Sequence, residues 1–82
     1  MYELWDAKSS NVIRFFQSAQ EADRVLTETV RQQGAAILDP LVLLHEDDDE
    51  ESHLVAEGQA ILVAVKRLSA EEHGTAEARR AV

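Results

Sequence analysis

The chain has 82 residues, 45% of them apolar and 29% charged, which is the composition of one folded domain. It contains no cysteine, so disulfides, thiolate catalysis, iron–sulfur clusters and cysteine-ligated zinc are excluded. No apolar run reaches the roughly 18 residues that a membrane helix needs, and no signal peptide pattern is present. We therefore expect a cytoplasmic protein without a membrane partner.

The negative charge is concentrated in one segment. The chain carries 16 acidic and 8 basic residues, for a net charge of −8, and Glu46 to Glu51 are all acidic. Burying unpaired carboxylates costs several kcal/mol each, so this segment is a solvated loop or an ion site. The basic residues are scattered, which argues against a nucleic-acid partner. A small basic face from Lys8 and Arg14 is the exception.

Residues 2–6 and 12–16 predict a β-hairpin. The first segment alternates in the period of a strand, the second is β-branched and aromatic, and small polar residues lie between them. A bulge near Arg14 would put Ile13 and Phe16 on the same face of the sheet. In the other register, Phe15 takes the place of Phe16.

Residues 19–33 predict a helix. Ser18 and Glu21 form a capping box, in which the hydroxyl accepts from the amide of Glu21 and the carboxylate reaches back to the amide of Ser18. Apolar residues then recur on one stripe, and Gly34 follows as a left-handed stop.

A second strand–strand–helix unit follows a connector at residues 35–39. Residues 41–45 and 52–56 predict strands on either side of the acidic tip. Residues 58–68 fit either a strand or a helix, and the apolar stripe with a basic end favours the helix. We expect one domain over residues 1–68 and a C-terminal extension over residues 69–82, either a short helix capped at Ser69 or a frayed tail.

This order predicts an α+β fold in which two ββα units form a four-stranded antiparallel sheet with two helices on one face. The other face stays open, and Trp5, Arg14 and Phe16 are the candidate ligand surface on it. A two-layer domain of this size leaves little room for a ligand pocket of roughly 300 Å³ or more. No nucleophile motif or glycine-rich phosphate loop is present, so we expect no enzyme and no catalytic residue.

Several structural positions resemble a group of short bacterial proteins of unknown function that open with a Tyr-x-Leu-Trp-Asp strand. They are Tyr2 to Asp6, Asn11 to Ile13, Phe16, Glu21-Ala22 and Val55 to Gly58. The resemblance covers most of residues 2–68 and implies a helix after Gly58. It implies no activity.

The histidines and the acidic loop are the candidate metal ligands. The loop lacks the glycine and glutamate positions of an EF-hand when counted from Asp47. His45 and His53 flank it and could face each other, and with Asp47 or Glu51 they would suit zinc or nickel. The simpler interpretation is a solvated hairpin tip beside a cross-strand polar pair, so we predict no metal and no other cofactor.

We therefore expect a small non-enzymatic protein–protein interaction module that forms a homodimer. The reason is the segment 60–68, whose apolar residues surround most of the helix, in a chain too short to bury them. We expect Ile61, Leu62, Val65 and Leu68 to form the interface. The alternatives are a metal- or ligand-responsive regulator using His45, His53 and the acidic loop, and a weak nucleic-acid-binding module on the hairpin face.

Overall fold

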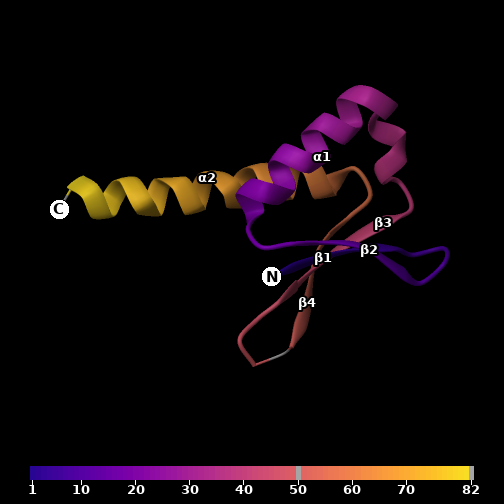
Figure 1. Ribbon diagram of the computed structural model, residues 1–82, viewed down its shortest axis with the longest axis horizontal. Coiled ribbons are helices and arrows are strands. Elements are labelled where there is room, and N and C mark those ends of the chain that lie inside the picture. Colours follow the sequence, from indigo (N-terminus) through magenta and orange to yellow (C-terminus); the bar gives the residue numbers. More distant parts are fainter. Residues whose placement is uncertain (50, 82) are drawn as a thin grey trace.

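Seven elements follow one another in the computed structural model, which describes the backbone of residues 1–49 and 51–81 and the side chains of residues 1–49 and 51–72. In chain order they are β1 (Tyr2–Asp6), β2 (Asn11–Phe16), α1 (Ala19–Gln33), the 3-10 helix η1 (Ala35–Leu38), β3 (Leu41–Glu46), β4 (Ser52–Glu57) and α2 (Ala60–Ala81) (Figure 1). The predicted order of two ββα units is confirmed.

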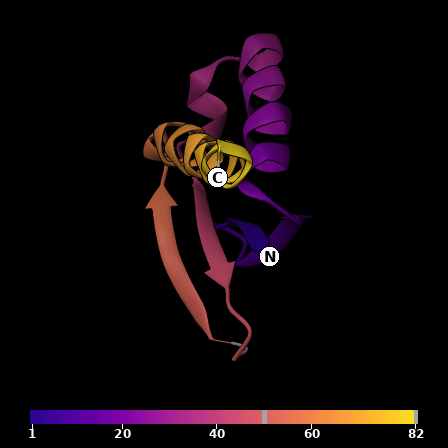
Figure 2. The same cartoon turned by 90° about the vertical axis from the view of Figure 1, so that its left-hand side faces the viewer.

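The four strands form one antiparallel sheet in the order β2-β1-β3-β4. The two hairpins therefore meet along β1 and β3, which are the central strands. Both helices lie on the same side of this sheet, as Figures 1 and 2 show. The predicted α+β architecture is confirmed, and it leaves the opposite side of the sheet without a second layer.

The first helix begins at the predicted cap. The Ser18 hydroxyl accepts from the backbone N–H of Glu21 at 3.1 Å, as in a capping box. The carboxylate of Glu21, however, accepts from the N–H of Gln17 at 3.1 Å instead of that of Ser18. Gly34 ends the helix with a positive φ of 92° and ψ of 157°, which is an extended conformation and differs from the left-handed helical one that we expected.

A bulge at Ile13 sets the faces of β2. Tyr2 lies opposite Phe16 and Leu4 opposite Arg14, but Trp5 lies opposite Val12, so Ile13 has no partner on β1. Directly opposed residues of an antiparallel pair point to the same side of a sheet. Phe16 and Arg14 therefore lie on the helix side with buried Leu4. This confirms the bulge that the sequence predicts.

The core lies between the sheet and the two helices. Its largest fully buried side chains come from β2, η1, β3 and α2, and they are Phe16, Leu38, Leu43, Ile61 and Val65. The sequence predicts a connector at residues 35–39, yet this segment forms η1 and buries Leu38. Apolar burial of this kind contributes roughly 1.5–3 kcal/mol for each large side chain.

The second helix extends beyond residue 68, where the sequence predicts its end. The segment 58–68 is a helix from Ala60 onward, and α2 continues without a break to Ala81. Ser69 therefore does not cap a separate short helix. Contacts with α1 explain part of this continuation, because the side chain of Glu72 bonds the backbone of Ala19 and Gln20.

Candidate functional site

The side of the sheet without helices carries apolar side chains from all four strands. We call this surface the open face. Its apolar members are Val12, Phe15, Trp5, Val42, Leu44 and Leu54. Phe15 is 51% exposed and Leu54 is 57% exposed, and they lie on the two edge strands. The other four residues lie on the central strands and at the turn end of β2. They are Trp5 on β1, Val42 and Leu44 on β3, and Val12 on β2.

The open face also carries carboxylates. Glu3 and Glu57 alternate with its apolar side chains along β1 and β4, and Glu46 lies at the end of β3. The indole N–H of Trp5 donates to the carboxylate of Glu3 at 3.4 Å. No lysine or arginine of the four described strands belongs to this face, since Arg14 is the one base among them and lies on the helix side.

The predicted ligand surface of Trp5, Arg14 and Phe16 does not form. Phe16 is fully buried under the helices, and Arg14 lies on the helix side, opposite Leu4. Trp5 lies on the open face, where Phe15 takes the place of Phe16. The cause is the bulge at Ile13, which adds one residue to β2 and changes which of its side chains share a face with Trp5. Trp5 and Arg14, two of the three residues expected to bind nucleic acid, are therefore on opposite sides of the sheet.

The predicted interface on α2 is also largely covered within one chain. Ile61 and Val65 have no exposed surface, because they pack into the core. Leu62 and Leu68 are half-buried against the same core. The large apolar residue of this segment that stays exposed is Val63, at 71%. The argument that one copy cannot cover this helix was wrong for Ile61 and Val65.

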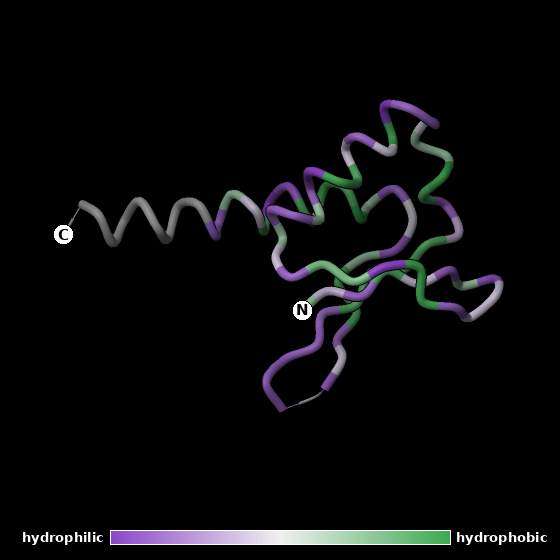
Figure 3. The backbone as a smooth tube through the Cα atoms, viewed as in Figure 1, coloured by the Kyte–Doolittle hydropathy of each residue, from purple (hydrophilic) through white to green (hydrophobic). Residues whose placement is uncertain are grey.

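Three potential metal ligands meet at the tip of the β3–β4 hairpin. Ligand atoms of Asp47, Glu51 and His53 all lie within 4.8 Å of one another. The Asp47 carboxylate contacts His53 Nε2 at 3.1 Å. Figure 3 shows the hydrophilic character of this tip. Glu50, which belongs to the acidic run in the sequence, lies outside the described residues.

Asp47 is held in place from two sides. Its Oδ1 accepts from the backbone N–H of Asp49 at 3.0 Å and of Glu51 at 3.1 Å, while its Oδ2 meets His53. The hydrogen bond from His53 and those backbone N–H groups hold the pKa of Asp47 below its ordinary value. The carboxylate therefore stays ionised at neutral pH in a fixed orientation.

The two histidines are cross-strand neighbours, as the sequence predicts. His45 lies directly opposite His53 in the β3–β4 register. The ring of His45, however, packs on Tyr2, with 4.6 Å between the ring centroids. His45 is not part of the group formed by Asp47, Glu51 and His53.

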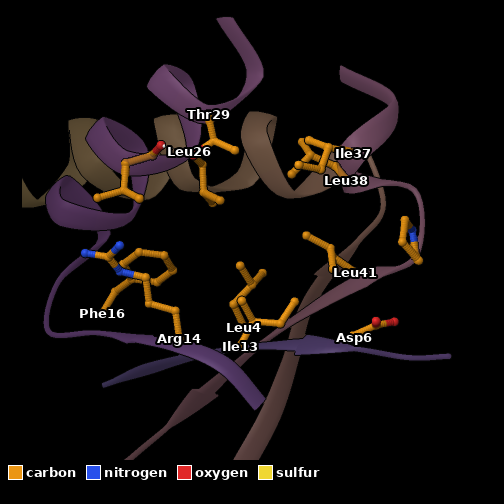
Figure 4. A pocket seen from close by; sticks show the side chains of 12 residues that line it. Leu4, Asp6, Ile13, Arg14, Phe16, Leu26, Thr29, Ile37, Leu38 and Leu41 are labelled. Carbon is orange, nitrogen blue, oxygen red and sulfur yellow. Dashed lines mark hydrogen bonds between the residues drawn. The ribbon is translucent and has the colours of Figure 1, made fainter. Parts of the chain in front are cut away.

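The structure contains a cavity, so the prediction that the domain has little room for a ligand pocket of roughly 300 Å³ or more was wrong. It has a volume of about 400 Å³ and lies between the β1–β2 hairpin on one side and α1 with η1 on the other. Its lining comes from β1, β2, α1, η1 and the start of β3. Leu4 and Ile13 rise from the sheet into this space, and Leu26 and Leu38 face them from the helices (Figure 4). Nothing in the apolar periodicity indicates this cavity.

Comparison with known proteins gives no relative: no family model matches the chain, and neither the curated proteins nor the solved structures contain a match. The resemblance to short bacterial proteins therefore stays a prediction from the sequence. Among the described residues, no helix combines the length and the apolar character needed to cross a membrane.

Proposed function

We propose that the chain is a protein–protein interaction module whose open face binds a partner protein with apolar and basic side chains. The observation that carries the proposal is the composition of the open face, which combines apolar residues with carboxylates and has no basic residue from its strands. Contiguous apolar surface of this kind on a small domain typically marks an interaction site.

The exposed apolar residues of the open face are not needed by the fold. The core is complete on the helix side, where Tyr2, Leu4 and Leu43 are buried. Phe15 and Leu54 instead lie half-exposed on the edge strands, where a polar residue would serve a solvated strand equally well. Binding of a partner removes this apolar surface from water, at roughly 25 cal/mol for each Å².

Charge indicates the kind of partner. A second copy docked face to face would bring the carboxylates of Glu3 and Glu57 in two chains into one interface, and like charges across an interface cost energy. A partner with lysine or arginine beside its apolar residues would instead pair with these carboxylates. We therefore favour a basic partner over the homodimer that the sequence suggested.

Trp5 gives a direct test, because it is the one tryptophan of the chain and lies on the open face. Two designed helical peptides with the same leucine stripe are titrated, one with lysine and one with glutamate at the polar positions. We expect the lysine peptide to shift the Trp5 emission saturably and the glutamate peptide to leave it unchanged. Equal effects from both peptides, or no effect from either, would contradict the proposal.

Matched variants locate the binding surface. Leu54→Ser should weaken binding of the lysine peptide. Val63→Ser, at a site on α2 that is 71% exposed against 57% for Leu54, should not. The double variant Glu3→Gln/Glu57→Gln should lower the affinity for the lysine peptide. The control Asp48→Asn/Asp49→Asn removes two charges from the hairpin tip and should lower this affinity less. Sedimentation of the chain alone at micromolar concentration tests the homodimer, and a dimer lost in Leu54→Ser would replace the partner with a second copy.

Binding of a zinc or nickel ion at the β3–β4 tip is a second candidate function. It is favoured by the position of His53 beside Asp47 and Glu51, because an imidazole together with carboxylates suits these metals better than carboxylates alone. Calorimetric titration with each metal tests it. We expect His53→Asn to abolish the heat of binding, and a wild-type chain that gives no heat would eliminate this function.

A further inference from the structure

The cavity between α1 and the β1–β2 hairpin has apolar walls and two different polar ends. Its volume of about 400 Å³ lies within the 300–1,000 Å³ that small-molecule sites typically have. Figure 4 shows Arg14 beside Phe16 at one end of the cavity and Asp6 at the other. Leucine and isoleucine side chains form most of the wall between these ends.

The guanidinium of Arg14 is available for a ligand. It lies over the ring of Phe16, with 5.5 Å from its carbon to the ring centroid, and this contact holds the side chain at the rim of the cavity. Among the described residues, no carboxylate forms an ion pair with it. The guanidinium therefore keeps its charge without a carboxylate partner, although the chain has a net charge of −8.

Asp6 makes the two ends of the cavity opposite in charge. One oxygen of its carboxylate accepts from the backbone N–H of Lys8 at 2.9 Å, which fixes the side chain at the end of β1. A bound anion is repelled from this end and attracted to the Arg14 end, so a ligand with one negative charge has one favourable orientation.

We propose that this cavity binds a small molecule with an apolar body and a single carboxylate, with the carboxylate at Arg14. The apolar body would contact Ile13 on the hairpin side, which is 53% exposed, and the partly buried Ile37 on the helix side, above the buried Leu4 and Leu26. This site is separate from the open face, because the sheet lies between them. The proposal therefore does not depend on the proposed partner protein.

Octanoate and 1-octanol are the probes, because they share an alkyl chain and differ in the charged group. Binding is followed at about 0.15 M salt from the NMR methyl signals of Leu4, Leu26 and Leu38. We expect saturable shifts of these methyls and about three- to fivefold tighter binding of octanoate, as a partly exposed ion pair would give. The net charge of the protein acts against octanoate, so a preference for it reports a local cation.

Variants assign the preference to Arg14. Arg14→Gln should remove the preference for octanoate and leave the affinity for 1-octanol unchanged, and Arg14→Lys should keep part of it. Arg67→Gln, which removes an exposed arginine from α2, should change neither probe. Leu54→Ser should also change neither, which separates the cavity from the open face. Thermal melting checks that each variant is folded.

Three results would overturn the proposal. Equal affinity of the two probes in the wild-type chain would show that no cation recognises the ligand. A preference that survives in Arg14→Gln would place the charge recognition elsewhere. Shifts restricted to the methyls of Val42, Leu44 and Leu54 would show that the probes bind the open face instead.

Discussion

The side chain of Glu72 on α2 caps the helix that begins at Ala19. Its carboxylate accepts from the N–H of Ala19 at 3.0 Å and from that of Gln20 at 3.2 Å, so both oxygens contact the first turn of α1. The first N–H groups of a helix have no partner inside it, and the helix dipole favours a negative charge there. This contact therefore joins α2 to the start of α1, in addition to the packing of both helices in the core.

Replacing Glu72 should destabilise the whole domain. We expect Glu72→Ala to lower the free energy of unfolding by about 1 kcal/mol, the usual cost of a lost helix cap, and Glu72→Gln to lower it less. Urea unfolding followed by circular dichroism at pH 7 measures both. Arg67→Ala is the control, since it changes an exposed position on the same helix. Equal stability of Glu72→Ala and this control would show that the capping contact contributes nothing.

Two adjacent phenylalanines should respond very differently to truncation. Phe16 is fully buried, so Phe16→Ala should cost about 3–5 kcal/mol of stability. Phe15 lies on the open face and is 51% exposed, so Phe15→Thr should change stability by less than about 0.5–1 kcal/mol. Thermal melting of the two variants at the same pH decides the assignment. If Phe15→Thr proves the more damaging of the two, the register of β2 is different from the one described.

Local signals in the sequence were sufficient for much of the fold. Ser18 and Glu21 are three residues apart and mark the start of α1, and the alternation of Tyr2 to Asp6 marks β1. Each of these signals depends on neighbouring residues, so a single sequence contains it. The contact of Glu72 with α1, however, joins residues that are 53 positions apart, and no local pattern indicates it.

The candidate sites were harder to predict because they depend on faces and spacing. One extra residue at Ile13 decides that Phe15 lies on the open face and Phe16 in the core, and periodicity alone leaves both registers open. The cavity is lined by residues of the β1–β2 hairpin, α1 and η1, which are far apart in the chain, so the periodicity of no single element indicates it. Cross-strand pairing of His45 and His53 was predictable, because both flank the same turn.

The loss of stability at acid pH should depend partly on Asp47. Its pKa is lowered in the folded state, mainly by the hydrogen bond from His53. A carboxyl with a lowered folded pKa stabilises the fold above its ordinary pKa of 3.8, and this contribution is lost as the pH falls through the folded value. We expect the melting temperature of the wild-type chain to fall more steeply below pH 4 than that of Asp47→Asn. Parallel slopes would contradict this.

The loss of stability at alkaline pH should depend partly on Tyr2. Burial raises the pKa of its phenol above the ordinary 10.0, and the charges of Glu72 and Glu71 add to the effect. The folded state then keeps a proton that the unfolded chain releases, so this contribution is complete below pH 10 and is lost as the pH rises through the folded pKa. Between pH 9 and about 11, the wild-type chain should lose more stability than Tyr2→Phe. An equal loss in the two proteins would remove Tyr2 as the cause.

The two glycines with positive φ should differ in which residues can replace them. Gly58 has a φ of 59°, and a Cβ there would lie 3.7 Å from the carbonyl oxygen of Asp39, an ordinary contact. Gly58→Ala should therefore cost about 1 kcal/mol from the backbone alone, and Gly58→Asn should cost less, because asparagine tolerates the left-handed region. Gly34 has a φ of 92° with a ψ of 157°, a region that is essentially restricted to glycine.

At Gly34 we expect alanine and asparagine to be equally unfavourable, at about 1–3 kcal/mol each, although no atom lies within 4 Å of an added Cβ. Asparagine does not help there because its advantage is limited to the left-handed helical region. Urea unfolding of the four variants measures the pattern. If Gly34→Asn proves more stable than Gly34→Ala, the extended conformation at Gly34 is contradicted. The helix would then end with a left-handed residue, as the sequence predicts.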